Sequence, residues 1–183
     1  AGRTVELVES LTPDIRVQFT APDNQAVNAG DIVASSGRVG IYGTLIKNSG
    51  LVSASRAEVG DGGKVVLKAA KDVTLDATSR IEANGAKGGS ITVQGETGTL
   101  LASGTIEATG DAGKGGTVQL LGTQVGLIGN ASVDASGQTG GGTVLVGGDL
   151  QGKNPEIQNA SQTFIAPDAA IRADAIQTGD GGT

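Results

Sequence analysis

The chain has 183 residues and a formal net charge of −6, and it contains no histidine and no cysteine. Without these residue types it cannot build a Ser-His or Cys-His nucleophile pair, a disulfide or an ordinary zinc site. Its 13 lysines and arginines are dispersed, which argues against nucleic acid or an anionic membrane surface as a partner. No stretch of 18 apolar residues predicts a membrane span.

The first part of the chain is predicted to form one long coil of a solenoid. Val5 and Leu7 are expected to open this coil as a strand, and Ile32-Val33-Ala34 to close it. The fit is looser here than further along the chain, where the pattern repeats at a fixed period.

From residue 62 onward, pairs of glycines return at a regular spacing. The intervals between the first glycines of the first four pairs are 26, 27 and 26 residues, and the pairs are Gly62-Gly63, Gly88-Gly89, Gly115-Gly116, Gly141-Gly142 and, after a longer interval, Gly181-Gly182. A fixed period of this length is typical of stacked coils. We expect the glycines to occupy corners where the backbone needs a positive φ.

Each coil is predicted to open with a strand in which alternate residues are aliphatic. Alternate side chains of a strand face opposite sides, so these residues should line the interior. The two inward rows are Val39, Val65, Ile91, Val118 and Val144, and beside them Ile41, Leu67, Val93, Leu120 and Val146.

A short motif closes each coil: an apolar residue, an outward residue and an alanine. It occurs at Val52, Ile81, Ile106, Val133 and Ile171, and six residues before each of these stands another aliphatic, namely Ile46, Leu75, Leu100, Leu127 and Ile165. Three short strands in each coil predict an all-β parallel β-helix of about six coils that forms a single segment over residues 1–183.

The outward residues of the closing motif form the best carboxylate cluster in the sequence. Glu82, Glu107 and Asp134 should stack at the strand spacing of about 4.8 Å, with Ser53 before them and Arg172 after them. Such a ladder could bind calcium through its carboxylate oxygens. The favoured interpretation is a solvated polar face on which Arg172 eases the repulsion, with no cofactor.

Residues 147–167 interrupt the period as an insertion. Inserted loops on solenoids often lie on the binding side, and Asp149, Gln151, Lys153, Asn154, Gln158 and Asn159 could hydrogen-bond a glycan. The favoured alternative is a structural excursion that lengthens a corner, with Phe164 packed inward beside Ile165.

Several stretches together resemble the filamentous haemagglutinin family, the large exoproteins of two-partner secretion. The more specific ones are residues 118–137 (VQLLGTQVGLIGNASVDASG), 140–149 (GGGTVLVGGD), Asn159-Ala160, 173–175 (ADA) and 179–182 (GDGG). Earlier stretches with the same likeness are 2–8 (GRTVELV), 21–30 (APDNQAVNAG) and 37–43 (GRVGIYG). The resemblance covers nearly the whole chain.

This resemblance implies a right-handed parallel β-helix, exported by a partner outer-membrane transporter and displayed on, or shed from, a Gram-negative cell. The implied role is adhesion to host cells, other bacteria or matrix polysaccharide. The chain is expected to be a segment of a longer exoprotein that follows the secretion domain. The matching residues are corner glycines and core aliphatics, so no binding residue carries over from the family.

Three functions remain open from the sequence. The first is a non-catalytic structural or adhesive segment of a secreted adhesin, whose ends could associate end to end. The second is a carbohydrate-binding module that uses the loop 149–159. The third, ranked lowest, is a polysaccharide lyase or hydrolase that depends on Glu107 or Asp134.

Overall fold

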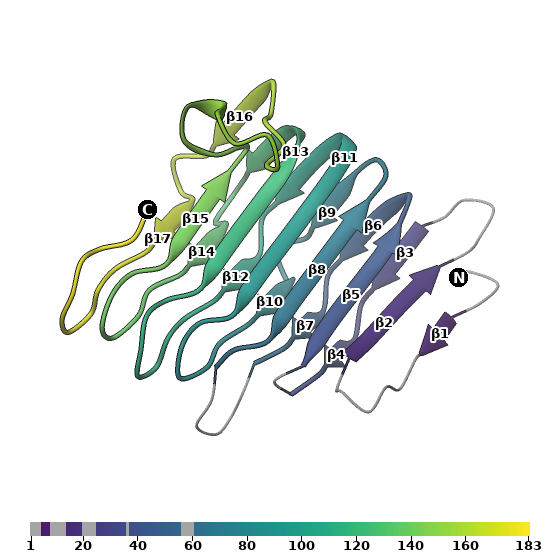
Figure 1. The fold of residues 1–183 in the computed structure, drawn as a ribbon. Coiled ribbons are helices and arrows are strands. Elements are labelled where there is room, and N and C mark those ends of the chain that lie inside the picture. The colour runs from purple at the N-terminus through teal and green to yellow at the C-terminus, as the bar shows by residue number, and fades with distance from the viewer. Residues whose placement is uncertain (1–4, 8–13, 20–24, 36, 56–60) are drawn as a thin grey trace.

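The computed structural model describes residues 5–7, 14–19, 25–35, 37–55 and 61–183. These residues form an all-β parallel β-solenoid with two parallel sheets. Its strands lie side by side along the axis of the stack, and β1 (Val5–Leu7) and β17 (Ala170–Arg172) lie at opposite ends of it (Figure 1). Within the described ranges, no helix is long and apolar enough to cross a bilayer.

The strands form three faces around the interior. The first face contains β2 (Asp14–Phe19), β5 (Arg38–Gly43), β8 (Lys64–Ala69), the first parts of β11 (Ser90–Ala102) and β13 (Thr117–Leu127), and β15 (Thr143–Val146). The second face contains β3 (Gln25–Asn28), β6 (Leu45–Asn48), β9 (Val73–Leu75), the later parts of β11 and β13, and β16 (Gln162–Ile165). Because β11 and β13 run through both faces, these two faces are one sheet.

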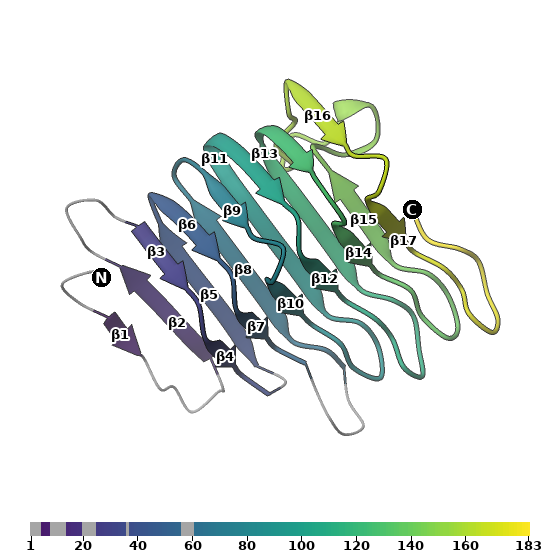
Figure 2. The same cartoon turned by 180° about the vertical axis from the view of Figure 1, so that it is seen from behind.

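The third face is a separate parallel sheet, visible behind the first face in Figure 1 and from the other side in Figure 2. Its strands are β4 (Asp31–Val33), β7 (Leu51–Ser53), β10 (Arg80–Glu82), β12 (Thr105–Glu107), β14 (Ser132–Asp134) and β17 (Ala170–Arg172). The turns that start at β5, β8, β11 and β13 contain all three faces without a long insertion, so the solenoid has about four regular turns.

Both predicted rows of the first face are confirmed by the strand register. Val65 pairs with Val39 and Ile91, and the same row continues through Val118 to Val144. The row that contains Leu67 and Leu120 runs beside it, and both of these side chains are fully buried. The closing row is also confirmed, with Ile81 between Val52 and Ile106, and it extends back to Ile32.

The predicted row six residues before the closing motif is confirmed for Leu75, Leu127 and Ile165 and is wrong at Ile46 and Leu100. Ile46 and Leu100 both pair with Val73, whereas Leu75 pairs with Asn48 and Ala102. The link from the second to the third face has two residues in some turns and four in others, as after β6 and β9. A shift of two residues keeps a side chain on the same side of its strand, so the sequence pattern does not reveal it.

This register places Asn48 inward, in the row of Leu75 and Leu127. Asn48 is fully buried and accepts a hydrogen bond from Asn28 Nδ2 at 2.8 Å. Its own Nδ2 donates to the carbonyl oxygen of Gly50 at 3.0 Å. These bonds satisfy the buried amide, as a polar group in an aliphatic core requires.

The predicted opening strand at Val5 and Leu7 is also corrected. Residues Val5–Leu7 form β1, which pairs antiparallel with β2, and it is β2 that opens the first coil. Ile15 aligns with Val39 and Val17 with Ile41. Both stretches alternate aliphatic and polar residues, so the pattern could not choose between them; β1 covers the free edge of β2.

The paired glycines serve close stacking, and the prediction of positive φ at these pairs is wrong. None of them has a positive φ, a conformation found instead at glycines such as Gly129 and Gly147. A Cβ at Gly116 would lie 2.1 Å from the carbonyl oxygen of Gly89, and one at Gly115 would lie 1.8 Å from that of Ala135. The backbones of successive turns therefore approach more closely than any side chain allows.

Candidate functional site

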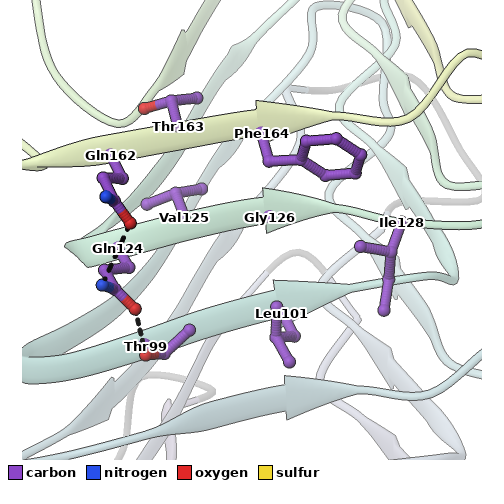
Figure 3. Close-up of a pocket in the computed structure, with 9 residues that line it drawn as sticks. All are labelled: Thr99, Leu101, Gln124, Val125, Gly126, Ile128, Gln162, Thr163 and Phe164. Carbon is purple, nitrogen blue, oxygen red and sulfur yellow. Dashed lines mark hydrogen bonds between the residues drawn. The ribbon is translucent and has the colours of Figure 1, made fainter.

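The outer side of the second face is hollowed where β11, β13 and β16 lie side by side (Figure 3). The groove has a volume of about 450 Å³ and is lined by Thr99, Leu101, Gln124, Val125, Gly126, Ile128, Gln162, Thr163 and Phe164. This groove was not predicted from the sequence, because Phe164 was expected to pack inward. In the structure Phe164 is 59% exposed and lies between the inward-facing positions Thr163 and Ile165, which pair with Val125 and Leu127.

The insertion is shorter than the sequence indicated, since β16 returns to the second face at Gln162. The chain leaves the sheet after Val146 and forms one 3-10 turn, η1 (Leu150–Gly152). The backbone N–H of Leu150 donates to the Asp149 carboxylate at 2.7 Å, and Asn154 Nδ2 donates to it at 3.1 Å. These two bonds, the first being the stronger cause, lower the pKa of Asp149 below its usual value.

Other predicted ligand residues of the loop also make structural contacts. Asn159 Nδ2 donates to the carbonyl oxygen of Gly152 at 3.2 Å. Gln158 Oε1 accepts a hydrogen bond from Gln94 Nε2 at 2.8 Å, and Gln158 Nε2 donates to the carbonyl oxygen of Glu96 at 2.9 Å, which ties the loop to β11. Leu121, the strand partner of Gln94, faces outward and yet is only 3% exposed. The loop is therefore anchored over the sheet.

Gln151 and Lys153 remain free to contact a ligand. Both are exposed, and neither side chain makes a hydrogen bond or ion pair with the residues that the structure describes. Gln151 is held at φ 56°, a left-handed conformation that is uncommon for a residue other than glycine. Glycan binding by this loop stays a prediction.

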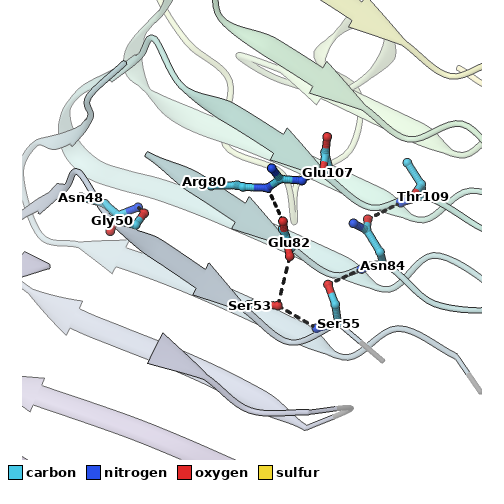
Figure 4. Close-up of polar contacts among 9 residues, drawn as sticks. All are labelled: Asn48, Gly50, Ser53, Ser55, Arg80, Glu82, Asn84, Glu107 and Thr109. Carbon is cyan, nitrogen blue, oxygen red and sulfur yellow. Dashed lines mark hydrogen bonds and ion pairs between the residues drawn. The ribbon is translucent and has the colours of Figure 1, made fainter. Parts of the chain in front are cut away.

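The carboxylate ladder forms as predicted on the third face, and Figure 4 shows two of its members, Glu82 and Glu107. The register aligns Glu82 with Ser53 and Glu107, and Glu107 with Asp134, which in turn pairs with Arg172. Ser53 Oγ donates to Glu82 Oε2 at 3.3 Å. Asp134 Oδ1 accepts from the backbone N–H of Ser136 at 2.8 Å.

The cation that neutralises this ladder is Arg80, whereas Arg172 was expected from the sequence to do so. Arg80 Nη2 lies 3.0 Å from Glu107 Oε2, and Arg80 Nε pairs with Glu82 Oε1. The charge of Glu107, followed by the hydrogen bond and charge of Glu82, raises the pKa of Arg80. Arg80 stands two residues before Glu82 on one strand, a spacing that puts both on the outward side and could have signalled the pair. Arg172 forms no ion pair with a described residue.

The ladder is thus an ion-paired polar surface in this structure. Across the described ranges, no group of three acidic residues is arranged to hold a metal ion. Calcium binding at Glu82, Glu107 and Asp134 stays a prediction, and it would have to displace Arg80 from two of the three carboxylates.

Polar residues next to the ladder join successive turns. The backbone N–H of Asn84 donates to Ser55 Oγ at 3.0 Å, and that of Thr109 donates to Asn84 Oδ1 at 2.8 Å (Figure 4). These side chains supply acceptors where the turns leave the third face, so their role is structural.

No protein-family model and no curated protein matches the chain. Among solved structures, the chain is similar to the HMW1 secretion domain from Haemophilus influenzae, with 21% identity and a TM-score of 0.49. The match covers 86% of this chain and 53% of that structure, so the chain spans about half its length. At this level of similarity the fold assignment rests on the strand pairings of the chain itself, and no residue role is transferred.

Proposed function

We propose that this chain is a structural segment of a large adhesin, secreted by the two-partner route to the surface of a Gram-negative bacterium. In this proposal it is a right-handed β-helix of six coils within a longer exoprotein. Its role is either to hold the binding part of the exoprotein away from the cell or to contribute itself to attachment to cells or biofilm matrix. The support is the likeness of residues 118–137 and 140–149 to filamentous haemagglutinin exoproteins.

The observation that favours a structural segment is the continuity of the interior. Aliphatic rows such as Val52, Ile81, Ile106 and Val133 are buried from turn to turn. Each turn also bonds to the next outside its strands, as where the N–H of Ala83 donates to the carbonyl oxygen of Glu107 at 2.8 Å. A stack built from repeated neighbour contacts makes a rod whose length grows with each coil.

The partners in this proposal are an outer-membrane transporter during export and a receptor on host or bacterial surfaces, including a glycan or exopolysaccharide. End-to-end association of the rods is a further part of it. Catalysis is not part of it. What supports a structural role for these carboxylates is their contacts: Glu82 and Glu107 are paired with Arg80, and Asp134 accepts from a backbone N–H.

A second candidate is carbohydrate binding by the loop 149–159. Its support is the exposed tip, where Leu150 is 77% exposed beside Gln151 and Lys153. Asp149, Asn154 and Asn159 are engaged within the loop, so their replacement would disturb its shape as well as any ligand contact. The double variant Gln151→Ala, Lys153→Ala tests ligand contact alone.

Localisation and attachment together test the proposal. An antibody raised against the chain should detect it at the outer surface of intact source cells or in the medium; confinement to the cytoplasm would refute export. Beads coated with the chain should adhere to epithelial or bacterial cells if the segment is adhesive. Adherence absent from coated beads but present for the parent protein would leave the chain as a spacer.

A turnover assay addresses the enzymatic alternative. Incubation with anionic and neutral polysaccharides should release no reducing ends and no unsaturated products. Release that is lost on Glu107→Gln or Asp134→Asn would overturn the structural role.

A further inference from the structure

We propose that the groove across β11, β13 and β16 is a binding site for an uncharged glycan chain. This inference deepens the proposed role in attachment and rests on it. It assigns the contact to a sheet surface, away from the insertion loop.

The shape of the groove comes from one missing side chain. Leu101, Gly126 and Phe164 form an outward row across three neighbouring strands. Gly126 is itself buried, and a Cβ there would lie 2.8 Å from Leu101 Cδ2, so the Leu101 side chain leans over Gly126 and any side chain at 126 would push it into the hollow. The backbones of β11 and β16 stand two strand spacings apart, about 10 Å, and the side chains of Leu101 and Phe164 bound the hollow between them.

The walls of the hollow are apolar and include an aromatic ring. Phe164, Leu101 and Ile128 face the hollow, and Phe164 is largely exposed (Figure 3). An exposed aromatic side chain offers a flat apolar surface, on which the C–H face of a pyranose packs with its hydroxyl groups directed to the sides. Phe164 is one of only three aromatic residues in the chain, which has one Tyr and two Phe.

A polar row runs beside the apolar one. Thr99 Oγ1 donates to Gln124 Oε1 at 3.4 Å, and Gln124 Nε2 donates to Gln162 Oε1 at 3.2 Å. Because the amides are joined head to tail, their orientation is fixed, while Gln162 Nε2 has no partner among the described residues. Amide groups donate and accept, as sugar hydroxyls do, and a few convergent polar groups beside an apolar wall are typical of small-molecule sites.

The composition of the groove decides the class of ligand. None of its nine lining residues is charged. An anionic polysaccharide, a nucleic acid or a charged peptide would lose hydration on entering without gaining an ion pair. On the next strands of this face, β9 and β6, the same outward row contains Thr74 and Lys47. The apolar surface therefore ends at β11.

The direction of the bound chain follows from the two rows. Both run across the strands, parallel to the axis of the solenoid, and each repeats at the strand spacing of about 4.8 Å. That repeat is close to the length of one sugar unit in an extended β-linked chain. The glycan would therefore lie along the axis, with successive units beside β11, β13 and β16.

Two variants close or remove the site without touching the core. Gly126→Val fills the hollow; Gly126 lacks a positive φ, and the atom it would meet is the far end of a leucine side chain, which can move. Phe164→Ala removes one wall and lies on the outward side of β16. Gln119→Ala, outward on β13 but outside the groove, is the matched control, and Gln151→Ala with Lys153→Ala tests the loop.

Calorimetric titration with cellohexaose, mannohexaose and chitohexaose, each against an oligogalacturonate of the same length, tests the site. We expect the folded wild type to bind at least one neutral hexamer more tightly than the charged one. Gly126→Val and Phe164→Ala should each weaken that binding at least tenfold, whereas Gln119→Ala and the loop variant should leave it within twofold. Circular dichroism and thermal melting confirm that each variant is folded.

Other results overturn the inference. Absence of binding to all three neutral hexamers, preference for the charged oligomer, or equal binding by wild type and both groove variants would each do so. Self-association of the wild type that Gly126→Val abolishes, without glycan binding, would assign the groove to a second copy of the chain. Bead adherence is measured on the same variants, so adherence that survives Gly126→Val leaves the proposed function standing while the groove fails.

Discussion

The four regular turns and the last turn, which carries the insertion, follow the same inward rows by different routes. From β13 onward, Val118 still aligns with Val144, Leu127 with Ile165 and Val133 with Ile171, although residues 147–161 intervene. The additional residues lie outside the sheet, where Gln158 anchors them to β11. The paired interior positions are therefore kept, whereas the outer surface accepts a whole loop.

Burial differs between these turns even within one row. Val133 is fully buried, whereas Ile171, its partner on the next strand, is 41% exposed. Among the described strands, β17 has a neighbour on one side only. Burial in this fold is thus supplied by the adjoining turns and varies along a row of chemically equivalent residues.

The largest effect that separates the two regions is expected from Leu127→Asp. An unpaired carboxylate in a fully buried position should cost about 4 kcal/mol or more of unfolding free energy, measured by urea denaturation. Ile165→Asp, in the same row but 48% exposed, should cost clearly less. Gln119→Asp, which faces outward, should be nearly silent. Equal costs at 127 and 119 would refute the register.

Gly116→Ala should be the next most damaging change. Its Cβ would meet the carbonyl oxygen of Gly89 at 2.1 Å, and backbone atoms of a stacked turn cannot move aside. We expect a loss of about 3 kcal/mol in unfolding free energy. Gly30→Ala is the control, since nothing lies within 4 Å of that Cβ. A neutral result for Gly116→Ala would show that the turns stack less closely than described.

Asn48→Ala tests the polar position in an otherwise aliphatic row. The change removes the acceptor for Asn28 Nδ2 and the donor for the carbonyl oxygen of Gly50. Asn28 Nδ2 keeps its bond to the carbonyl oxygen of Leu51, and the carbonyl oxygen of Gly50 keeps its bond from the N–H of Arg80. The loss of the two Asn48 bonds should therefore cost about 1–2 kcal/mol by urea denaturation. The counterpart Leu75→Asn, which places an amide without a partner in the same row, should be at least as harmful. If Leu75→Asn were tolerated, the need for paired amides in this row would be disproved.

Arg80→Ala should have a small effect. Its side chain is about half exposed, and exposed ion pairs contribute at most about 1 kcal/mol. The unfolding free energy should fall by less than that. Added salt should then raise the unfolding free energy of the variant, because it screens the repulsion between Glu82 and Glu107, whereas in the wild type it weakens the ion pairs. Calcium binding that appears only in Arg80→Ala would show that the arginine occupies the place of the metal.

The smallest and most local effect concerns pH and the insertion. Because the folded pKa of Asp149 is lowered, its contribution to loop order is present above the ordinary aspartate value and is lost as pH falls through the lowered pKa. Amide exchange at Leu150 should accelerate on acidification in the wild type. Asp149→Asn, which cannot titrate, should remove this pH dependence. The same acceleration in the variant would exclude Asp149 as its source.

The sequence was most informative about elements that recur at one residue in every turn. The opening rows through Val65 and Leu67, the closing row through Ile81 and the ladder of Glu82 and Glu107 all recur in this way. Strand alternation then decides which side each residue faces. The sequence pattern did not predict the pairing on the second face. The links from this face to the third have two residues in some turns and four in others, and both lengths keep a side chain on the inward side while changing its partner.

The composition and period of the chain by themselves determined a stacked all-β solenoid with an aliphatic interior and a polar exterior. Repetition carries this information, since each turn meets the same neighbours. Only the tertiary structure decided that Asn48 is internal, that the glycine pairs serve stacking and that Phe164 faces a groove. Those outcomes depend on distances between neighbouring turns, which no pattern within one turn encodes.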